Sequence, residues 1–109
     1  MTTIHLLYVD DEENWLNAVG QILQTGEFVV DTATDGEMAL QKMAEQRYDM
    51  ILLDVRLKEE NGWESVRRFK QVQREVAVVL FTSDYEVERL TDVFGVGVED
   101  YLEKSSDIG

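Results

Sequence analysis

Charged or hydroxyl-bearing residues follow four apolar runs of this chain. They are, in chain order, Asp10 and Asp11, Asp54, Thr82 and Lys104. Three carboxylates, one hydroxyl and one ammonium group are suited to binding a divalent cation and a phosphoryl group together. A second interpretation holds for each residue taken alone: the Asp10-Asp11 pair could cap a helix, Asp54 could belong to a turn, and Lys104 could be a solvated surface lysine.

The runs that precede these residues have the pattern of buried strands. The stretch 49–56 contains an apolar run that ends in the single carboxylate of Asp54 and is bounded by charged residues, as in a strand covered on both faces. If the runs Ile4–Val9, 76–81 and 98–102 are strands parallel to it, their carboxyl ends gather at one edge of a sheet. Ligands of open α/β sheets bind at that edge. The sequence therefore predicts a binding site there.

Helical spacing of apolar residues separates the runs. The four predicted apolar helix faces carry Trp15, Ala18, Val19, Ile22 and Leu23; Met38, Ala39, Leu40, Met43 and Ala44; Trp63, Val66 and Phe69; and Val87, Leu90, Val93 and Phe94. Asp35-Gly36 is expected to open the second helix. Residues 28–33 form a more polar run that we expect at a sheet edge. Strands alternating with helices predict an α/β fold with right-handed crossovers.

Composition limits the classes of function. A chain of 109 residues fits one domain, 1–109, and its net charge of −13 disfavours contact with nucleic acid. The chain has no cysteine, so a disulfide framework and a thiolate metal site are excluded. It also lacks an apolar run of the roughly 20 residues that a membrane span needs, and residues 1–3 do not show the basic flank and apolar stretch expected of a signal peptide. We expect a cytoplasmic domain.

An ordered set of motifs resembles the receiver domain of two-component response regulators. It comprises Val9-Asp10-Asp11-Glu12, Asp54, Asn61-Gly62, Thr82-Ser83 and Tyr101-Leu102-Glu103-Lys104. The resemblance runs from the first strand to the end of the chain. It implies a doubly wound, flavodoxin-like, five-stranded parallel sheet in the order 2-1-3-4-5, with the site at the switch point beside strand one.

The resemblance also implies residue roles at the metal site. Asp54 would be the phosphoacceptor. Mg²⁺ (or Mn²⁺) would be bound directly by Asp11, Asp54 and the backbone carbonyl of Arg56, with Asp10 acting through water. Lys104 would add positive charge to the transferring oxygens.

The remaining implied roles concern switching. Thr82 would donate its hydroxyl to the bound phosphoryl group, with the small Ser83 beside it, and Tyr101 would turn inward as Thr82 moves. Ordinary half-buried packing is the alternative for Tyr101. Arg56 and Asp84 could screen the acyl phosphate from water, although two exposed charges that seldom meet are an equal interpretation. His5, within a strand, is expected to have no catalytic role.

Two departures from the family pattern affect the end of the chain. Ser105 replaces the proline that usually follows the lysine with a cis bond, so the peptide there could be trans. The chain stops at Gly109, before or within the expected fifth helix. We expect that the natural polypeptide continues; otherwise apolar surface on strands one and three would lie open, unless a second chain covers it in a homodimer.

The function that these features favour is a phosphorylation-dependent signalling switch rather than a metabolic enzyme. Its partners would be a histidine kinase or phosphotransfer protein and an output domain or effector outside this segment, with no nucleic acid or membrane contact by the domain itself. One alternative is a pseudo-receiver that binds partners without being phosphorylated. Another is an aspartate-nucleophile phosphatase, which Arg56 disfavours because those enzymes carry a second aspartate at that position.

Overall fold

The protein folds around one five-stranded parallel sheet. The computed structural model describes residues 3–24, 26–54, 61–82 and 97–103. Its elements are, in chain order, β1 (Ile4–Val9), α1 (Glu13–Leu23), β2 (Phe28–Ala33), α2 (Gly36–Glu45), β3 (Met50–Leu53), α3 (Asn61–Val72), β4 (Ala77–Thr82) and β5 (Asp100–Glu103). The helix expected around residues 87–94 and the segment after Lys104 lie outside the described residues.

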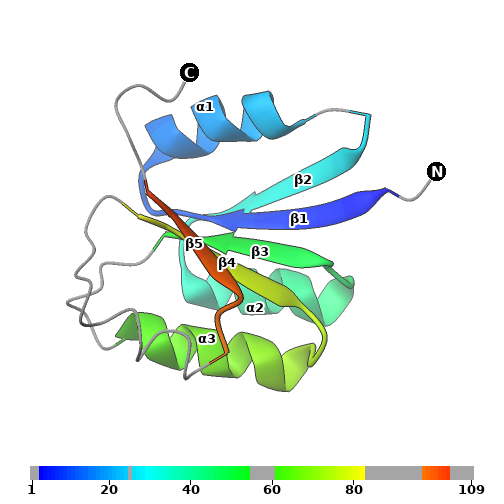
Figure 1. Ribbon diagram of the computed structural model, residues 1–109, viewed down its shortest axis with the longest axis vertical. Coiled ribbons are helices and arrows are strands. Elements are labelled where there is room, and N and C mark those ends of the chain that lie inside the picture. Colours follow the sequence, from blue (N-terminus) through cyan, green and yellow to red (C-terminus); the bar gives the residue numbers. More distant parts are fainter. Residues whose placement is uncertain (1–2, 25, 55–60, 83–96, 104–109) are drawn as a thin grey trace.

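The sheet has the strand order β2-β1-β3-β4-β5, and every pairing is parallel. The sequence prediction of order 2-1-3-4-5 with β2 at an edge is therefore confirmed. Figure 1 shows α1 on one face of the sheet and α2 and α3 on the other. Strand β2 is added on one side of β1, and β3, β4 and β5 are added on its other side. The neighbours β1 and β3 thus define the switch point, where this class of fold binds ligands.

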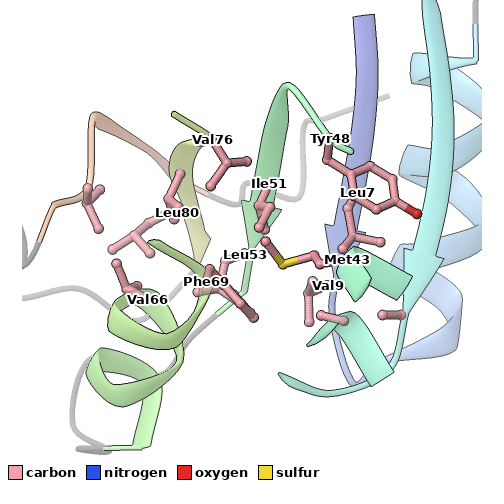
Figure 2. Close-up of a cluster of buried hydrophobic side chains, with 14 residues drawn as sticks. Leu7, Val9, Met43, Tyr48, Ile51, Leu53, Val66, Phe69, Val76 and Leu80 are labelled. Atoms are coloured by element: carbon pink, nitrogen blue, oxygen red, sulfur yellow. The ribbon is translucent and has the colours of Figure 1, made fainter. Parts of the chain in front are cut away.

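The larger apolar core lies between the sheet and the helices α2 and α3. Figure 2 shows Ile51, Leu53 and Leu80 from the sheet packed toward Phe69 of α3, with Met43 of α2 beside them. Side chains of β3 are buried on both sides of the sheet, since Leu52 points into the opposite cluster. The prediction of a strand buried on both faces is confirmed, and this burial fixes the backbone that leads to Asp54.

A smaller cluster lies on the α1 face. It contains Leu6, Tyr8, Leu16, Val19, Leu52 and Phe81. Leu6 is 2 % exposed, Tyr8 0 % and Leu52 6 %, so these side chains of β1 and β3 are buried in the structure. Six half-buried apolar residues among those described pack against this cluster: Trp15, Leu23, Phe28, Val30, Met50 and Val79.

The helix faces differ in part from the prediction. In α1, Leu16 and Val19 are buried, whereas Ala18 is exposed and Ile22 is 55 % exposed. Leu16, which the predicted face left out, is buried instead, and Trp15 of the predicted face is half-buried against the same cluster. Leu23 is half-buried as expected.

The second helix begins where the sequence predicts. The Asp35 carboxylate accepts a 2.8 Å hydrogen bond from the Met38 N–H, which satisfies one of the free amides of the first turn. Ala39 and Met43 are buried as predicted, whereas Met38 and Ala44 are exposed. No helix within the described ranges is both long and apolar enough to cross a membrane.

Candidate metal and phosphoacceptor site

Backbone hydrogen bonds hold the acids that follow β1 and β3 at the carboxyl edge of the sheet. The Asp54 N–H donates to the Val9 carbonyl oxygen at 2.8 Å, and the Asp10 N–H donates to the Ala33 carbonyl oxygen at 3.0 Å. These bonds continue the parallel ladders one residue beyond the strands. Asp10 and Asp54 therefore leave the sheet side by side at its carboxyl edge.

Three carboxylates meet at this edge. One oxygen each from Asp10, Asp11 and Asp54 lies within 4.8 Å of the other two. Asp10 is buried, Asp54 is half-buried and Asp11 is exposed, so the cluster has a closed inner side and an open outer side. A ligand would reach it from the solvent at the strand ends.

Asp10 is the one buried charged residue among those described, at 1 % exposure. A buried carboxylate is costly unless hydrogen bonds stabilise its charge. One Asp10 oxygen accepts a 2.7 Å hydrogen bond from the Tyr8 hydroxyl, and the other accepts a 2.9 Å bond from the Glu12 N–H. The protein thus stabilises this negative charge from both sides.

Tyr8 is held as a hydrogen-bond donor. Burial raises the pKa of its hydroxyl well above the ordinary value of 10.0, and the hydrogen bond and negative charge of Asp10 raise it further. The hydroxyl therefore keeps its proton wherever the protein is folded under ordinary conditions. Sequence reasoning missed this residue, although a signal existed: side chains two positions apart in a strand point to the same side, and Tyr8 is two before Asp10.

The donor set fits Mg²⁺ or Mn²⁺. These are hard cations that prefer oxygen, and Mg²⁺ usually takes one or two carboxylates with waters and phosphate oxygens. Asp11 and Asp54 are the more accessible acids of the three. Asp10, with both oxygens already accepting protein hydrogen bonds, fits contact through a bound water.

The other predicted site residues are placed only in part. Thr82 is the last residue of β4 and Tyr101 lies in β5, where it pairs with Leu80. Since β4 neighbours β3, the backbone of Thr82 reaches the same sheet edge as Asp54. Arg56, Ser83, Asp84 and Lys104 lie outside the described residues, as does the peptide that follows Lys104.

His5 lies at the other end of β1. Its backbone N–H donates to an Asp49 carboxylate oxygen at 2.9 Å, and its ring Nδ1 is 3.4 Å from the Gln46 amide nitrogen. Asp49 precedes β3 whereas Asp54 follows it, so this histidine is a strand length away from the acidic cluster. It takes no part in the candidate site.

Fold and site together define a doubly wound α/β domain with a cation-type acidic cluster at its switch point. The chain belongs to the response regulator receiver domain family, whose sequence model matches residues 6–109. Proteins of this family act in two-component signalling, and the domain is a signalling module.

Similar proteins include both curated relatives and solved structures. The protein-glutamate methylesterase/protein-glutamine glutaminase of Nocardioides sp. is 33 % identical over 113 residues, which cover 100 % of this chain and 31 % of that protein. The regulatory protein VanRB of Enterococcus faecalis is 30 % identical over 102 residues, covering 94 % of this chain and 46 % of that protein. This chain thus spans less than half the length of either relative.

Among solved structures, the response regulator TrrA of Thermotoga maritima in complex with Mg²⁺-BeF is similar with a TM-score of 0.78. It is 27 % identical, and the match covers 96 % of this chain and 90 % of that one. Chemotaxis response regulator CheY4 of Vibrio cholerae gives a TM-score of 0.82 at 28 % identity, covering 94 % of this chain and 88 % of that one.

Proposed function

We propose that this chain is a phosphoacceptor receiver in which Asp54 accepts a phosphoryl group from a histidine kinase or a phosphotransfer protein, with Mg²⁺ (or Mn²⁺) bound beside it. The observation that carries the proposal is the meeting of Asp10, Asp11 and Asp54 within 4.8 Å at the switch point. Three carboxylates this close repel one another, so a fold that gathers them favours a bound cation.

In the proposed transfer, a carboxylate oxygen of Asp54 attacks the phosphorus of a phosphohistidine. An oxygen–phosphorus bond forms, the phosphorus–nitrogen bond breaks, and the imidazole leaves with the bonding electron pair. Asp54 suits this role because it is half-buried and at the open end of β3, while Asp10 is enclosed. Attack of water on the phosphorus later returns the free carboxylate and inorganic phosphate.

Mg²⁺, when bound, would neutralise the repulsion between the carboxylates and the incoming phosphoryl oxygens. Asp11 and Asp54 would hold it directly, together with the Arg56 carbonyl, and Asp10 would hold it through water. Thr82 and Lys104 would contact the phosphoryl group, with Ser83 beside them. The Mg²⁺-BeF complex of TrrA supports this assignment, since that relative binds both species.

The switch would act through the β4–β5 edge of the sheet. Phosphoryl contact with Thr82 would favour one of two pre-existing arrangements, and Tyr101 on the neighbouring strand would follow it. Arg56 and Asp84 would set how long the acyl phosphate lasts. The relatives' names include a methylesterase and a regulatory protein, so we infer an output domain or effector beyond this segment.

Intact-mass measurement after incubation with acetyl phosphate and Mg²⁺ tests the proposal. We expect a gain of one phosphoryl group in the wild type and in Asp49→Asn, and none in Asp54→Asn. Asp49 is a suitable control because it lies at the opposite end of β3 from Asp54. A chelator should abolish the gain.

Two results would count against the proposal. An adduct that persists in Asp54→Asn would place the phosphoacceptor elsewhere. No adduct in the wild type, with Mg²⁺ or with Mn²⁺, would favour the pseudo-receiver, a domain that binds partners without being phosphorylated.

A further inference from the structure

We propose that Tyr8 is a positioning residue of the cation site, and that its hydroxyl fixes the Asp10 carboxylate in the orientation that holds a Mg²⁺-bound water. This inference rests on the proposed function, because it assumes that the acidic cluster binds the cation. It adds a residue that touches neither the metal nor the phosphoryl group and acts through Asp10.

The first support is the hydrogen-bond geometry of Asp10. Its two carboxylate oxygens accept from different donors, the Tyr8 hydroxyl at 2.7 Å and the Glu12 N–H at 2.9 Å. A carboxylate with one bond on each oxygen cannot rotate about its terminal bond without breaking at least one of them. The orientation of Asp10 is therefore set by these two donors.

The second support is that Tyr8 is enclosed by close packing. Its side chain is 0 % exposed, and its ring packs edge-on against Phe81 with centroids 6.1 Å apart at 63°. Phe81 in turn packs against Trp15 of α1, with centroids 5.7 Å apart at 83°. Close-packed aromatic side chains of this kind hold a hydroxyl at a fixed point.

The same packing joins the two halves of the proposed site. Tyr8 contacts Asp10 through its hydroxyl and Phe81 through its ring, and Phe81 immediately precedes Thr82. The acid that follows β1 and the end of β4 are thus linked by one enclosed side chain. A displacement of Asp10 on cation binding would be transmitted through Tyr8 to the end of β4.

Replacing Tyr8 by phenylalanine removes only the hydroxyl. The ring keeps its place against Phe81, while Asp10 loses a donor in a buried position and its carboxylate gains rotational freedom. Loss of a hydrogen bond that orients a direct metal ligand typically weakens metal affinity by about 10- to 100-fold, and the lower end applies here because Asp10 would hold the cation through water. We expect the Kd for Mg²⁺ to rise about 10-fold in Tyr8→Phe.

Tyr48 provides a matched control. It is also buried, at 3 % exposure, and its hydroxyl also donates a 2.7 Å hydrogen bond to an aspartate, Asp31 of β2. Figure 2 shows Tyr48 at the edge of the larger core with its hydroxyl turned away from the aliphatic side chains. Tyr48→Phe therefore removes the same kind of bond away from the acidic cluster.

The test follows amide NMR shifts of Asp10, Asp11 and Asp54 during a Mg²⁺ titration of wild type, Tyr8→Phe and Tyr48→Phe. Urea unfolding of the three proteins measures their stabilities separately. We expect both variants to lose stability, with a raised Kd in Tyr8→Phe only.

An unchanged Kd in Tyr8→Phe would overturn the inference and leave the proposed function standing. An equal rise of Kd in both variants would overturn it as well, because general loosening would then explain the effect. Absence of Mg²⁺ binding in the wild type would overturn both the inference and the cation site of the proposed function.

Discussion

Lys70 of α3 forms an ion pair with Glu99, which lies 29 positions further along the chain, just before β5. The second Glu99 oxygen accepts a 2.6 Å hydrogen bond from the Val78 N–H, and the Lys70 ammonium donates at 2.6 Å to the Val76 carbonyl. The turn before β5 contains Gly97 at φ +107°, a conformation that side chains rarely adopt. These contacts fix the start of the strand that carries Tyr101.

Glu99→Ala should lower the free energy of unfolding by about 1–2 kcal/mol. The reason is that it removes the acceptor of two hydrogen bonds, one donated by the Lys70 ammonium and one by the Val78 backbone N–H. Glu75→Ala is the matched control: Glu75 is 88 % exposed and 3.8 Å from Arg47, so its loss should cost under about 0.5 kcal/mol. Urea unfolding measures both. Equal losses in the two variants would contradict a positioning role for Glu99.

Asp35→Ala should destabilise α2 by about 1 kcal/mol, because the Met38 amide loses its side-chain acceptor. Asp35→Asn, which keeps an acceptor oxygen of the same reach, should cost much less. Chemical unfolding followed by helical circular dichroism compares them. A loss of the same size in both variants would mean that the negative charge, rather than the cap, matters at this position.

Four of the five strands and the edge that they share could be predicted from the sequence because each is an apolar run followed by a polar residue, whereas β2 is a partly buried edge strand. Ile4–Val9 and Phe28–Ala33 are strands with the predicted bounds, and α2 begins after Asp35 as expected. A carboxylate is costly to bury, so a buried apolar strand ends where the carboxylate appears. The resemblance then supplied the strand order, which no local pattern contains.

Contacts that join distant segments could not be predicted in this way. Gln73 donates from its amide nitrogen to the carbonyls of Met43 and Gln46 and accepts from the Tyr48 N–H, which ties the ends of α2 and α3 together. Nothing in the local sequence distinguishes this glutamine from an exposed one. The buried face of α1 was predicted only in part, because Leu16 was left out of the predicted face and Ile22, which was included, is 55 % exposed.

Alkaline pH should destabilise the protein through its buried tyrosines. Burial raises the pKa of Tyr8 and Tyr48 above the ordinary value of 10.0, so above that pH the unfolded chain loses protons that the folded chain keeps. Stability from these groups is therefore complete below about pH 10 and falls as the pH rises further. The hydrogen bonds to Asp10 and Asp31 act in the same direction as burial.

Absorbance of tyrosinate during a base titration measures this effect. Of the four tyrosines, we expect at least Tyr8 and Tyr48 to ionise only as the protein unfolds, whereas denatured protein should titrate all four near their ordinary pKa. Tyr8→Phe and Tyr48→Phe should each remove part of the late-titrating signal. Ionisation of all four in the folded protein would show that neither hydroxyl is enclosed.

Removing one charge from the acidic cluster should stabilise the metal-free protein, because Asp10, Asp11 and Asp54 repel one another in a chain that already carries a net charge of −13. Asp11→Asn is the suitable change, since Asp11 is exposed and its replacement disturbs no packing. The same change should remove most of the stabilisation by Mg²⁺. The wild type should gain about 1.4 kcal/mol when Mg²⁺ is tenfold above its Kd.

Glu13→Gln changes the net charge equally from an exposed position in the first turn of α1 and should keep that gain. Unfolding curves with Mg²⁺, and with NaCl at the same ionic strength, distinguish binding from screening. If NaCl stabilised the wild type as much as Mg²⁺ does, the cluster would be responding to screening rather than to a bound cation.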